Sequence, residues 1–242
     1  MDKNNQIEYY LIHCEEHNER LPHIQNIRWT VDKDIEIFKG YYTKRNSIEY
    51  VDQMNYLKQI DPNLSLPKDG DIKEYYPHKG DFSCFWSTGE MGCYLSHHML
   101  IKHISDTYNG QNGQNLGHYS VIFEDDVIID KSINSQIQTI IDSLKYINWD
   151  IIFLGNLNNN HKTHIVNNIY TLDKDDYCWG THGLLINNKN AKKIYEQTCQ
   201  IKRQIDNQYK ILIDYDWLDG LVIYPPICVQ CNQLPSTIQG TN

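Results

Sequence analysis

The stretch Tyr119–Val127 reads YSVIFEDDV and joins a short apolar run to three consecutive acidic residues. The run Val121–Phe123 is typical of a strand that is covered on both faces. In an open α/β sheet, ligands bind beyond the carboxyl ends of the strands, which is where the three acids would lie. Adjacent carboxylates repel one another unless a cation lies between them, and their oxygens suit Mg²⁺ or Mn²⁺. The stretch therefore predicts either a divalent-metal site or a solvated acidic turn.

Length and charge restrict the class of protein. The 242 residues are enough for one α/β domain with a substantial core. A net charge of −9 argues against binding nucleic acid through its phosphates, although a nucleotide held through a metal remains compatible with it. Seven scattered cysteines favour reduced thiols, and neither a secretion signal nor a membrane-spanning run is visible. We therefore expect a cytoplasmic protein that does not bind nucleic acid.

Apolar periodicity and turn residues predict alternating elements in the first half of the chain. The expected elements are a strand over 7–13, a helix from 15 to about 27, a short strand over 28–31, and helices over 47–60 and 87–104. The last of these begins with a possible capping box, Ser87 to Glu90. Long loops are expected over 61–82 and 109–118.

In the second half, a helix over 133–147 and a strand over 150–155 follow the acidic stretch, which predicts a parallel strand pair with a right-handed crossover. The remaining expected elements are a polar lid-like loop over 156–168, a strand over 184–186, a helix over 189–199, and strands over 211–213 and 222–229. No internal repeat or domain boundary is visible. We expect a single domain over 1–232 and a C-terminal tail over 233–242.

Five blocks of the sequence resemble, in order and spacing, the signature blocks of one family. They are Gly89–His97 (GEMGCYLSH), Val121–Val127 (VIFEDDV), Trp149–Gly155 (WDIIFLG), Thr181–Ile186 with the following Ala191–Lys193, and Ile205–Asp206. Together they resemble glycosyltransferase family 25 over about residues 7 to 231. The chain departs from the family pattern at Leu184, where Tyr is frequent, and at His13–Cys14, where Asn-Leu is usual.

The resemblance implies a fold and an activity. That family includes bacterial lipooligosaccharide galactosyltransferases and the galactosyltransferases that modify hydroxylysine in collagen. It implies an α/β fold of the GT-A nucleotide-diphospho-sugar transferase type, with a Rossmann-like, mostly parallel sheet flanked by helices. The expected reaction moves a hexose, galactose first and glucose second, from a UDP-sugar to an acceptor hydroxyl, with inversion at the anomeric carbon. The acceptor would be a glycan or hydroxylysine on a collagen-like chain, and the metal Mn²⁺, or else Mg²⁺.

Within the acidic triplet, the resemblance points to metal and nucleotide binding. A nucleoside diphosphate leaves with extra negative charge, which a bridging metal stabilises without a proton donor. We expect Asp126 to be the metal ligand, with Asp125 as the second candidate. Asp125 or Glu124 would otherwise face the ribose or a group behind the metal.

An inverting displacement also needs a general base for the acceptor hydroxyl. Asp206 is the first candidate because it matches a family acid, and the alternative is an ordinary exposed carboxylate on a helix. His182 lies in another matched block and could act as the base or a third metal ligand. The alternative for His182 is a histidine that is hydrogen-bonded structurally.

Four further residues are candidates for donor binding. Glu90, Ser96 and His97 belong to the block GEMGCYLSH, and Arg20 lies after the first strand. Glu90 could instead be only a capping acid, or the N-terminus of its helix could face the diphosphate. Arg20 could equally be a solvated helix residue.

Two other functions remain open from the sequence. A nucleotidyltransferase would need a glycine-rich basic loop near the first strand, and residues 11–20 hold no glycine. A catalytically degenerate relative could serve as a binding or assembly module, and the departure at His13–Cys14 is compatible with that role. The intact acidic triplet favours the enzyme.

Overall fold

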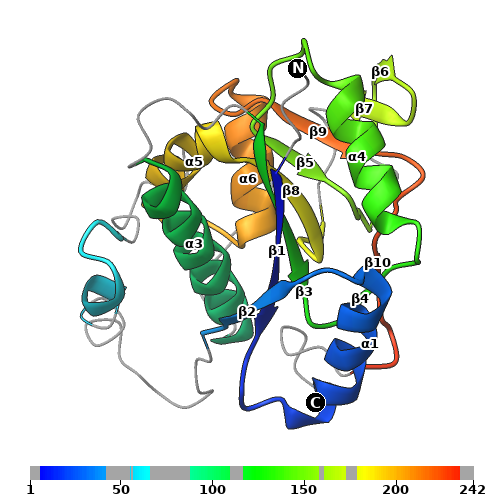
Figure 1. Cartoon of the computed structure of the whole chain (residues 1–242). Helices are drawn as coiled ribbons and strands as arrows, with labels where there is room; N and C mark the ends of the chain where they lie inside the picture. Colours follow the sequence, from blue (N-terminus) through cyan, green and yellow to red (C-terminus); the bar gives the residue numbers. More distant parts are fainter. Residues whose placement is uncertain are drawn as a thin grey trace.

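An eight-stranded sheet forms the centre of the protein (Figure 1). The computed structural model describes residues 6–41, 55, 57–65, 88–109, 117–157, 161–172 and 179–234. The strand order is β2-β1-β3-β8-β5-β9-β7-β6. These strands are β1 (Gln6–His13), β2 (Ile35–Lys39), β3 (His118–Glu124), β5 (Ile151–Phe153), β6 (His164–Val166), β7 (Ile169–Thr171), β8 (Gly183–Asn187) and β9 (Gly220–Ile223). A separate two-stranded sheet pairs β4 (Val127–Ile128) with β10 (Val229–Gln230).

Helices cover both faces of the large sheet (Figure 1). They are α1 (Leu21–Val31), α3 (Thr88–Asn109), α4 (Ile133–Ser143), α5 (Ala191–Thr198) and α6 (Ile205–Asp214), with short 3₁₀ helices over Asn18–Arg20 and Asn188–Asn190. Along β3, Val121 and Phe123 pack with α1 and α4, whereas Ile122 packs with α3, α5 and α6. The predicted burial of this strand on both faces is therefore confirmed.

The sheet is mixed, which corrects the expectation of a mostly parallel one. Strand β1 is parallel to β2 and β3, and β5 is parallel to β9. Strand β8, however, runs antiparallel between β3 and β5, and β7 runs antiparallel to β9 and β6. Strands β3 and β5 thus run in the same direction, as predicted, but β8 separates them, so they do not pair with each other. The α/β class with flanking helices is confirmed.

Two predicted strands are helical. Residues 28–31 belong to α1, because Ile24, Ile27 and Val31 share one buried stripe and helical spacing outweighs the preference of single residues for strands. Helix α1 begins only at Leu21 and ends before Asp32, whose left-handed backbone stops it. Residues 211–213 likewise belong to α6, where the buried side chains follow helical spacing.

The other predicted elements have mixed outcomes. The helices expected over 87–104, 133–147 and 189–199 correspond to α3, α4 and α5, and the strand over 184–186 to β8. The region 222–229 contains the end of β9 and the start of β10, and the loop over 156–168 contains β6. The predictions for 47–60, 61–82, 109–118, Ser87 and the tail fall largely outside the described residues. Within the described ranges, no helix has the length and apolarity needed to cross a bilayer.

Candidate active site

The ends of several strands bring the predicted site residues to one edge of the sheet. The register of β1 and β3 pairs Ile12 with Glu124, so His13, the last residue of β1, lies beside Asp125, the residue after β3. The register of β3 and β8 pairs Phe123 with Gly183, and the Glu124 N–H donates to the His182 carbonyl over 3.2 Å. The acidic triplet therefore lies where β1 and β3 end and β8 begins.

Glu124 contacts side chains from α3 and from the start of β8. Its Oε1 lies 2.8 Å from His97 Nε2, accepts the Thr181 hydroxyl over 2.6 Å, and lies 3.8 Å from the Cys93 thiol. Burial alone would raise the pKa of Glu124, but the His97 hydrogen bond and charge, with the Thr181 bond, lower it to about 2. Glu124 is therefore an ionised carboxylate with a fixed orientation.

Asp125 is held by two side chains that precede it in the chain by more than a hundred residues. His13 Nδ1 lies 2.7 Å from Asp125 Oδ2, and the Arg20 guanidinium donates to Asp125 Oδ1. All three side chains are buried. His13 is the last residue of β1, and Arg20 is the last residue of the 3₁₀ helix that follows. Both side chains therefore point toward the same carboxylate.

Asp126 differs from its two neighbours because half of its carboxylate is unpaired. The pairing of β4 with β10 brings Gln230 next to it, and the Gln230 amide donates to Asp126 Oδ2 over 3.1 Å. Oδ1 is buried and has no hydrogen-bond partner among the described residues. Burial and the charge of Glu124 raise the pKa of Asp126 to about 6. An unpaired carboxylate oxygen in a negative environment is a suitable ligand for a cation.

Asp206 lies in the first turn of α6, close to the triplet. Its two oxygens accept backbone N–H groups of Gly180, over 3.1 Å, and of Asn207, over 2.7 Å. Gly180 has φ +101°, a conformation that other residues rarely adopt. Burial and the charge of Glu124 raise the pKa of Asp206. Asp206 is thus a half-buried, oriented carboxylate rather than an ordinary exposed one.

His182 is buried next to Cys228, in the segment between β9 and β10. Its Nε2 lies 3.3 Å from the Cys228 carbonyl, and burial lowers the pKa of the ring. A Cβ added at Gly155 would come within 2.1 Å of the same nitrogen, so the glycine of the block WDIIFLG makes room for this imidazole. These contacts favour the structural alternative for His182, while its catalytic role stays a prediction.

Comparison with known proteins identifies the family. The sequence profile of glycosyltransferase family 25, described as an LPS biosynthesis protein, matches residues 6–209. The chain belongs to glycosyltransferase family 25. The predicted family is therefore confirmed.

Relatives of this family-25 chain include animal proteins. It is 32% identical to procollagen galactosyltransferase 1-A of Xenopus laevis over 118 residues, which cover 47% of this chain and 18% of that protein. It is 26% identical to procollagen galactosyltransferase 2 of Homo sapiens over 110 residues, or 44% of this chain and 16% of that protein. The alignments thus span less than a fifth of either relative.

The remaining donor-binding candidates of this family-25 chain lie on α3. Glu90 Oε1 accepts the Gln204 amide over 3.0 Å, which links the start of α3 to the start of α6. The Ser96 hydroxyl donates to the Gly92 carbonyl over 2.6 Å and accepts the Tyr41 N–H over 2.8 Å. His97 instead contacts Glu124 directly. Donor binding by these residues, and by Arg20, stays a prediction.

Four residues at the site were not among the predicted ones. Cys93 and Thr181 lie inside matched blocks, and His13 is one of the two departures from the family pattern, so each carried a signal in the sequence. Gln230 carried none, because its place depends on the pairing of β10 with β4.

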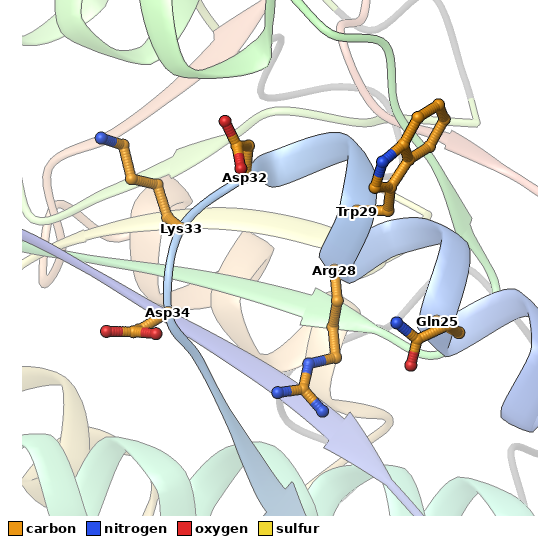
Figure 2. Close-up of a pocket in the computed structure, with 6 residues that line it drawn as sticks. All are labelled: Gln25, Arg28, Trp29, Asp32, Lys33 and Asp34. Atoms are coloured by element: carbon orange, nitrogen blue, oxygen red, sulfur yellow. The ribbon is translucent and has the colours of Figure 1, made fainter.

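A surface hollow lies apart from this site, around the end of α1 and the segment that leads to β2 (Figure 2). Its lining side chains are all different from the residues predicted for the site: Gln25, Arg28, Trp29, Asp32, Lys33 and Asp34. Two basic and two acidic groups alternate there, so the hollow carries no strong charge of one sign. The acids at the end of β3 therefore remain the candidate site, and this hollow does not replace them.

Proposed function

We propose that this chain is a metal-dependent, inverting glycosyltransferase with a GT-A-type fold. It would transfer a hexose, galactose first and glucose second, from a UDP-sugar to an acceptor hydroxyl. The buried, unpaired oxygen of Asp126, beside Glu124 and Asp206, is the observation that carries this proposal. Three acids at one sheet edge, with raised pKa values on two of them, are typical of a functional site.

The residues present fit a hard divalent cation such as Mn²⁺ or Mg²⁺. Asp126 would hold it, because Oδ1 is buried without a partner among the described side chains and a cation would relieve the repulsion from Glu124. Both oxygens of Asp125 are already bonded to His13 and Arg20, so Asp125 would fix the loop rather than bind the metal. When bound, the cation would stabilise negative charge on the departing diphosphate.

Asp206 is the better supported general base. Two backbone N–H groups orient its carboxylate, and its raised pKa makes it a stronger proton acceptor than an exposed aspartate. His182 is less suited, because it is buried and its Nε2 faces a backbone carbonyl. In this mechanism Asp206 would accept the proton of the acceptor hydroxyl as the sugar is transferred.

Only the names of the relatives and of the family indicate the chemical class of the acceptor. The name procollagen galactosyltransferase supports hydroxylysine on a collagen-like chain, and the family description as an LPS biosynthesis protein supports a glycan. Both present a hydroxyl group to the donor. An array of UDP-sugars and both acceptor classes, with mass detection, would identify the pair.

UDP binding with and without metal tests the proposal. We expect titration calorimetry to show much tighter UDP binding with Mn²⁺ than with a chelator, because a bare diphosphate is repelled by a chain of net charge −9. Asp126→Asn should abolish the difference. Asp32→Asn is the matched control, because Asp32 is exposed at the end of α1 and Asn tolerates its left-handed backbone. Equal affinity with and without Mn²⁺ would contradict the proposal.

The alternative is a degenerate transferase that serves as a binding or assembly module. The intact acids and the oriented Asp206 favour the enzyme, while the His13–Asp125 contact is the departure that leaves the alternative open. Slow, Mn²⁺-dependent hydrolysis of a UDP-sugar would support the enzyme. Tight UDP binding with no turnover on any acceptor would support the module.

A further inference from the structure

We propose that Cys93, His97 and Glu124 form a binding site for Zn²⁺, separate from the hard-cation position at Asp126. A thiol sulfur, an imidazole nitrogen and a carboxylate oxygen are available there, and the three atoms lie within 4.8 Å of one another. Each of these three atoms is of a type that Zn²⁺ binds in proteins. The inference does not depend on the sugar-transfer reaction.

Two of the three distances between ligand atoms are close to those around a bound ion. Zn²⁺ bonds of about 2.0–2.3 Å in tetrahedral geometry place the ligand atoms roughly 3.3–3.6 Å apart. The Cys93 sulfur lies 3.8 Å from Glu124 Oε1, so this pair needs to approach by only a few tenths of an ångström. His97 Nε2 lies 2.8 Å from the same oxygen and would move away by about half an ångström, exchanging its hydrogen bond for the metal.

The backbone elements hold these ligands in place. Cys93 and His97 are one turn apart on α3, so their side chains lie on the same face of the helix. Glu124 is the last residue of the central strand β3. The Thr181 hydroxyl donates over 2.6 Å to Glu124 Oε1, the same oxygen that faces Cys93 and His97, and would help to orient the carboxylate, as outer partners do in metal sites.

Chemistry separates this site from the one at Asp126. Thiolate and imidazole ligands favour Zn²⁺ over Mn²⁺ and Mg²⁺, which prefer oxygen. Burial and the charges of Glu124 and Asp206 raise the pKa of Cys93, so the thiol keeps its proton until a cation replaces it. Three protein ligands leave the fourth position open to water or a small anion.

Co²⁺ is a suitable optical probe, because a Co²⁺–thiolate bond gives a charge-transfer absorption that Zn²⁺ abolishes on displacing it. Metal-free wild-type protein should show this absorption at one equivalent of Co²⁺ and lose it when Zn²⁺ is added. Cys93→Ser should show none and should bind Zn²⁺ at least about tenfold more weakly, since loss of a mere outer partner already costs about 10–100-fold. Cys199→Ser is the matched control and should behave as wild type, because the Cys199 thiol lies away from this site and donates to the Tyr195 carbonyl.

Two further variants keep the outcome unambiguous. His97→Gln retains the thiol and should also weaken Zn²⁺ binding. If circular dichroism shows that Cys93→Ser is unfolded, His97→Gln tests the same site in its place. Asp126→Asn should keep Zn²⁺ binding while losing Mn²⁺-dependent UDP binding, which distinguishes failure of this site from failure of the proposed function. An absorption that persists in Cys93→Ser, or its absence in wild type, overturns the inference. Loss of Zn²⁺ binding in Asp126→Asn would show that the two cations share one site and would equally overturn it.

Discussion

His97 and His98 are consecutive residues of α3, yet the two lie in opposite kinds of surroundings. His97 contacts Glu124 at the sheet edge. His98 Nε2 instead lies 3.6 Å from Asp61, and its Nδ1 lies 2.9 Å from the Thr198 hydroxyl, in a fully buried group. One helix therefore places a histidine beside an acid in two separate regions of the molecule.

We call the group around Asp61 closed because each oxygen of its carboxylate has a hydrogen-bond donor, although His98 Nε2 has no hydrogen-bond partner among the described residues. The two oxygens of Asp61 accept the Tyr195 hydroxyl over 2.6 Å and the Asn63 N–H over 2.9 Å. Burial alone would raise the pKa of Asp61, but these hydrogen bonds lower it. Burial lowers the pKa of His98 to about 4, so the ring is neutral. The group joins residues 57–65 to α3 and α5 and has the character of a structural anchor.

The group around Glu124 is open by comparison. Asp126 and Asp206 lie near the same carboxylate, both with raised pKa values, and Asp126 keeps a buried oxygen without a partner in the described part of the chain. Gathering three like charges, one of them with an unbonded oxygen, costs stability, which is typical of a site built for a ligand. The comparison teaches that a buried histidine–acid pair indicates function only when the carboxylates around it are left with an unbonded oxygen.

Among the variants that test this comparison, Asp126→Asn should have the largest effect on the rate of sugar transfer. The amide keeps the size but loses the charge that holds a divalent ion, so transfer should fall by on the order of 10²-fold or more, or several kcal/mol in the barrier. Turnover and a thermal melt in chelator are the measurements. The melting temperature should not fall, because one of several crowded like charges is removed. Normal Mn²⁺-dependent transfer would place the metal on Asp125 or Glu124, and gross unfolding would make Asp126 structural.

Asp206→Asn should keep UDP binding and lower kcat by about 10²-fold or more, the usual effect of losing a general base. The amide can still accept one of the two backbone N–H groups, so the start of α6 should stay in place. Steady-state kinetics and UDP calorimetry measure the two quantities. If the variant turns over at the wild-type rate, the base lies elsewhere and His182→Gln is the next variant to test.

The pH dependence of stability sharpens the contrast in the metal-free protein. The pKa of Asp126 rises from an ordinary 3.8 to about 6 on folding, so the folded state favours its protonated form. The stabilisation is present below pH 4 and is lost as the pH rises through 6. In chelator, Asp126→Asn should therefore be more stable than wild type by about 2–3 kcal/mol at pH 8, and by almost nothing at pH 4. Urea unfolding at the two pH values measures this, and an equal difference at both would contradict it.

Asp61→Asn, the same substitution in the closed group, should have the smallest effect and the opposite pattern. The amide retains one acceptor but exchanges a charged hydrogen bond to Tyr195 for a neutral one, at a cost of about 1–2 kcal/mol in the free energy of unfolding. Because Asp61 lies among α3 and α5 rather than at the acidic triplet, kcat and KM should stay at wild-type values. A variant with unchanged stability but reduced turnover would break the comparison, because the closed group would then contribute to function.

The sequence alone determined the parts of this protein that depend on short-range pattern. The apolar run before Glu124 predicted a buried strand with acids at its end, and helical spacing located α3, α4 and α5. The ordered blocks predicted the family, because each block is recognised from the spacing of its own residues and does not depend on the order of the strands in the sheet. The two strands predicted over 28–31 and 211–213 failed because short apolar runs do not distinguish a strand from a buried helix face.

Only the tertiary structure decided which acid is bonded and which is left open. Strand β8 enters between β3 and β5 and carries Thr181 and His182 to Glu124, while β1 and β10 carry His13 and Gln230 to Asp125 and Asp126. These contacts join residues about 60 to more than 100 positions apart, and no local spacing encodes them. They arise because strands pair so as to bury both faces of the sheet, and the polar residues at the strand ends meet as a consequence.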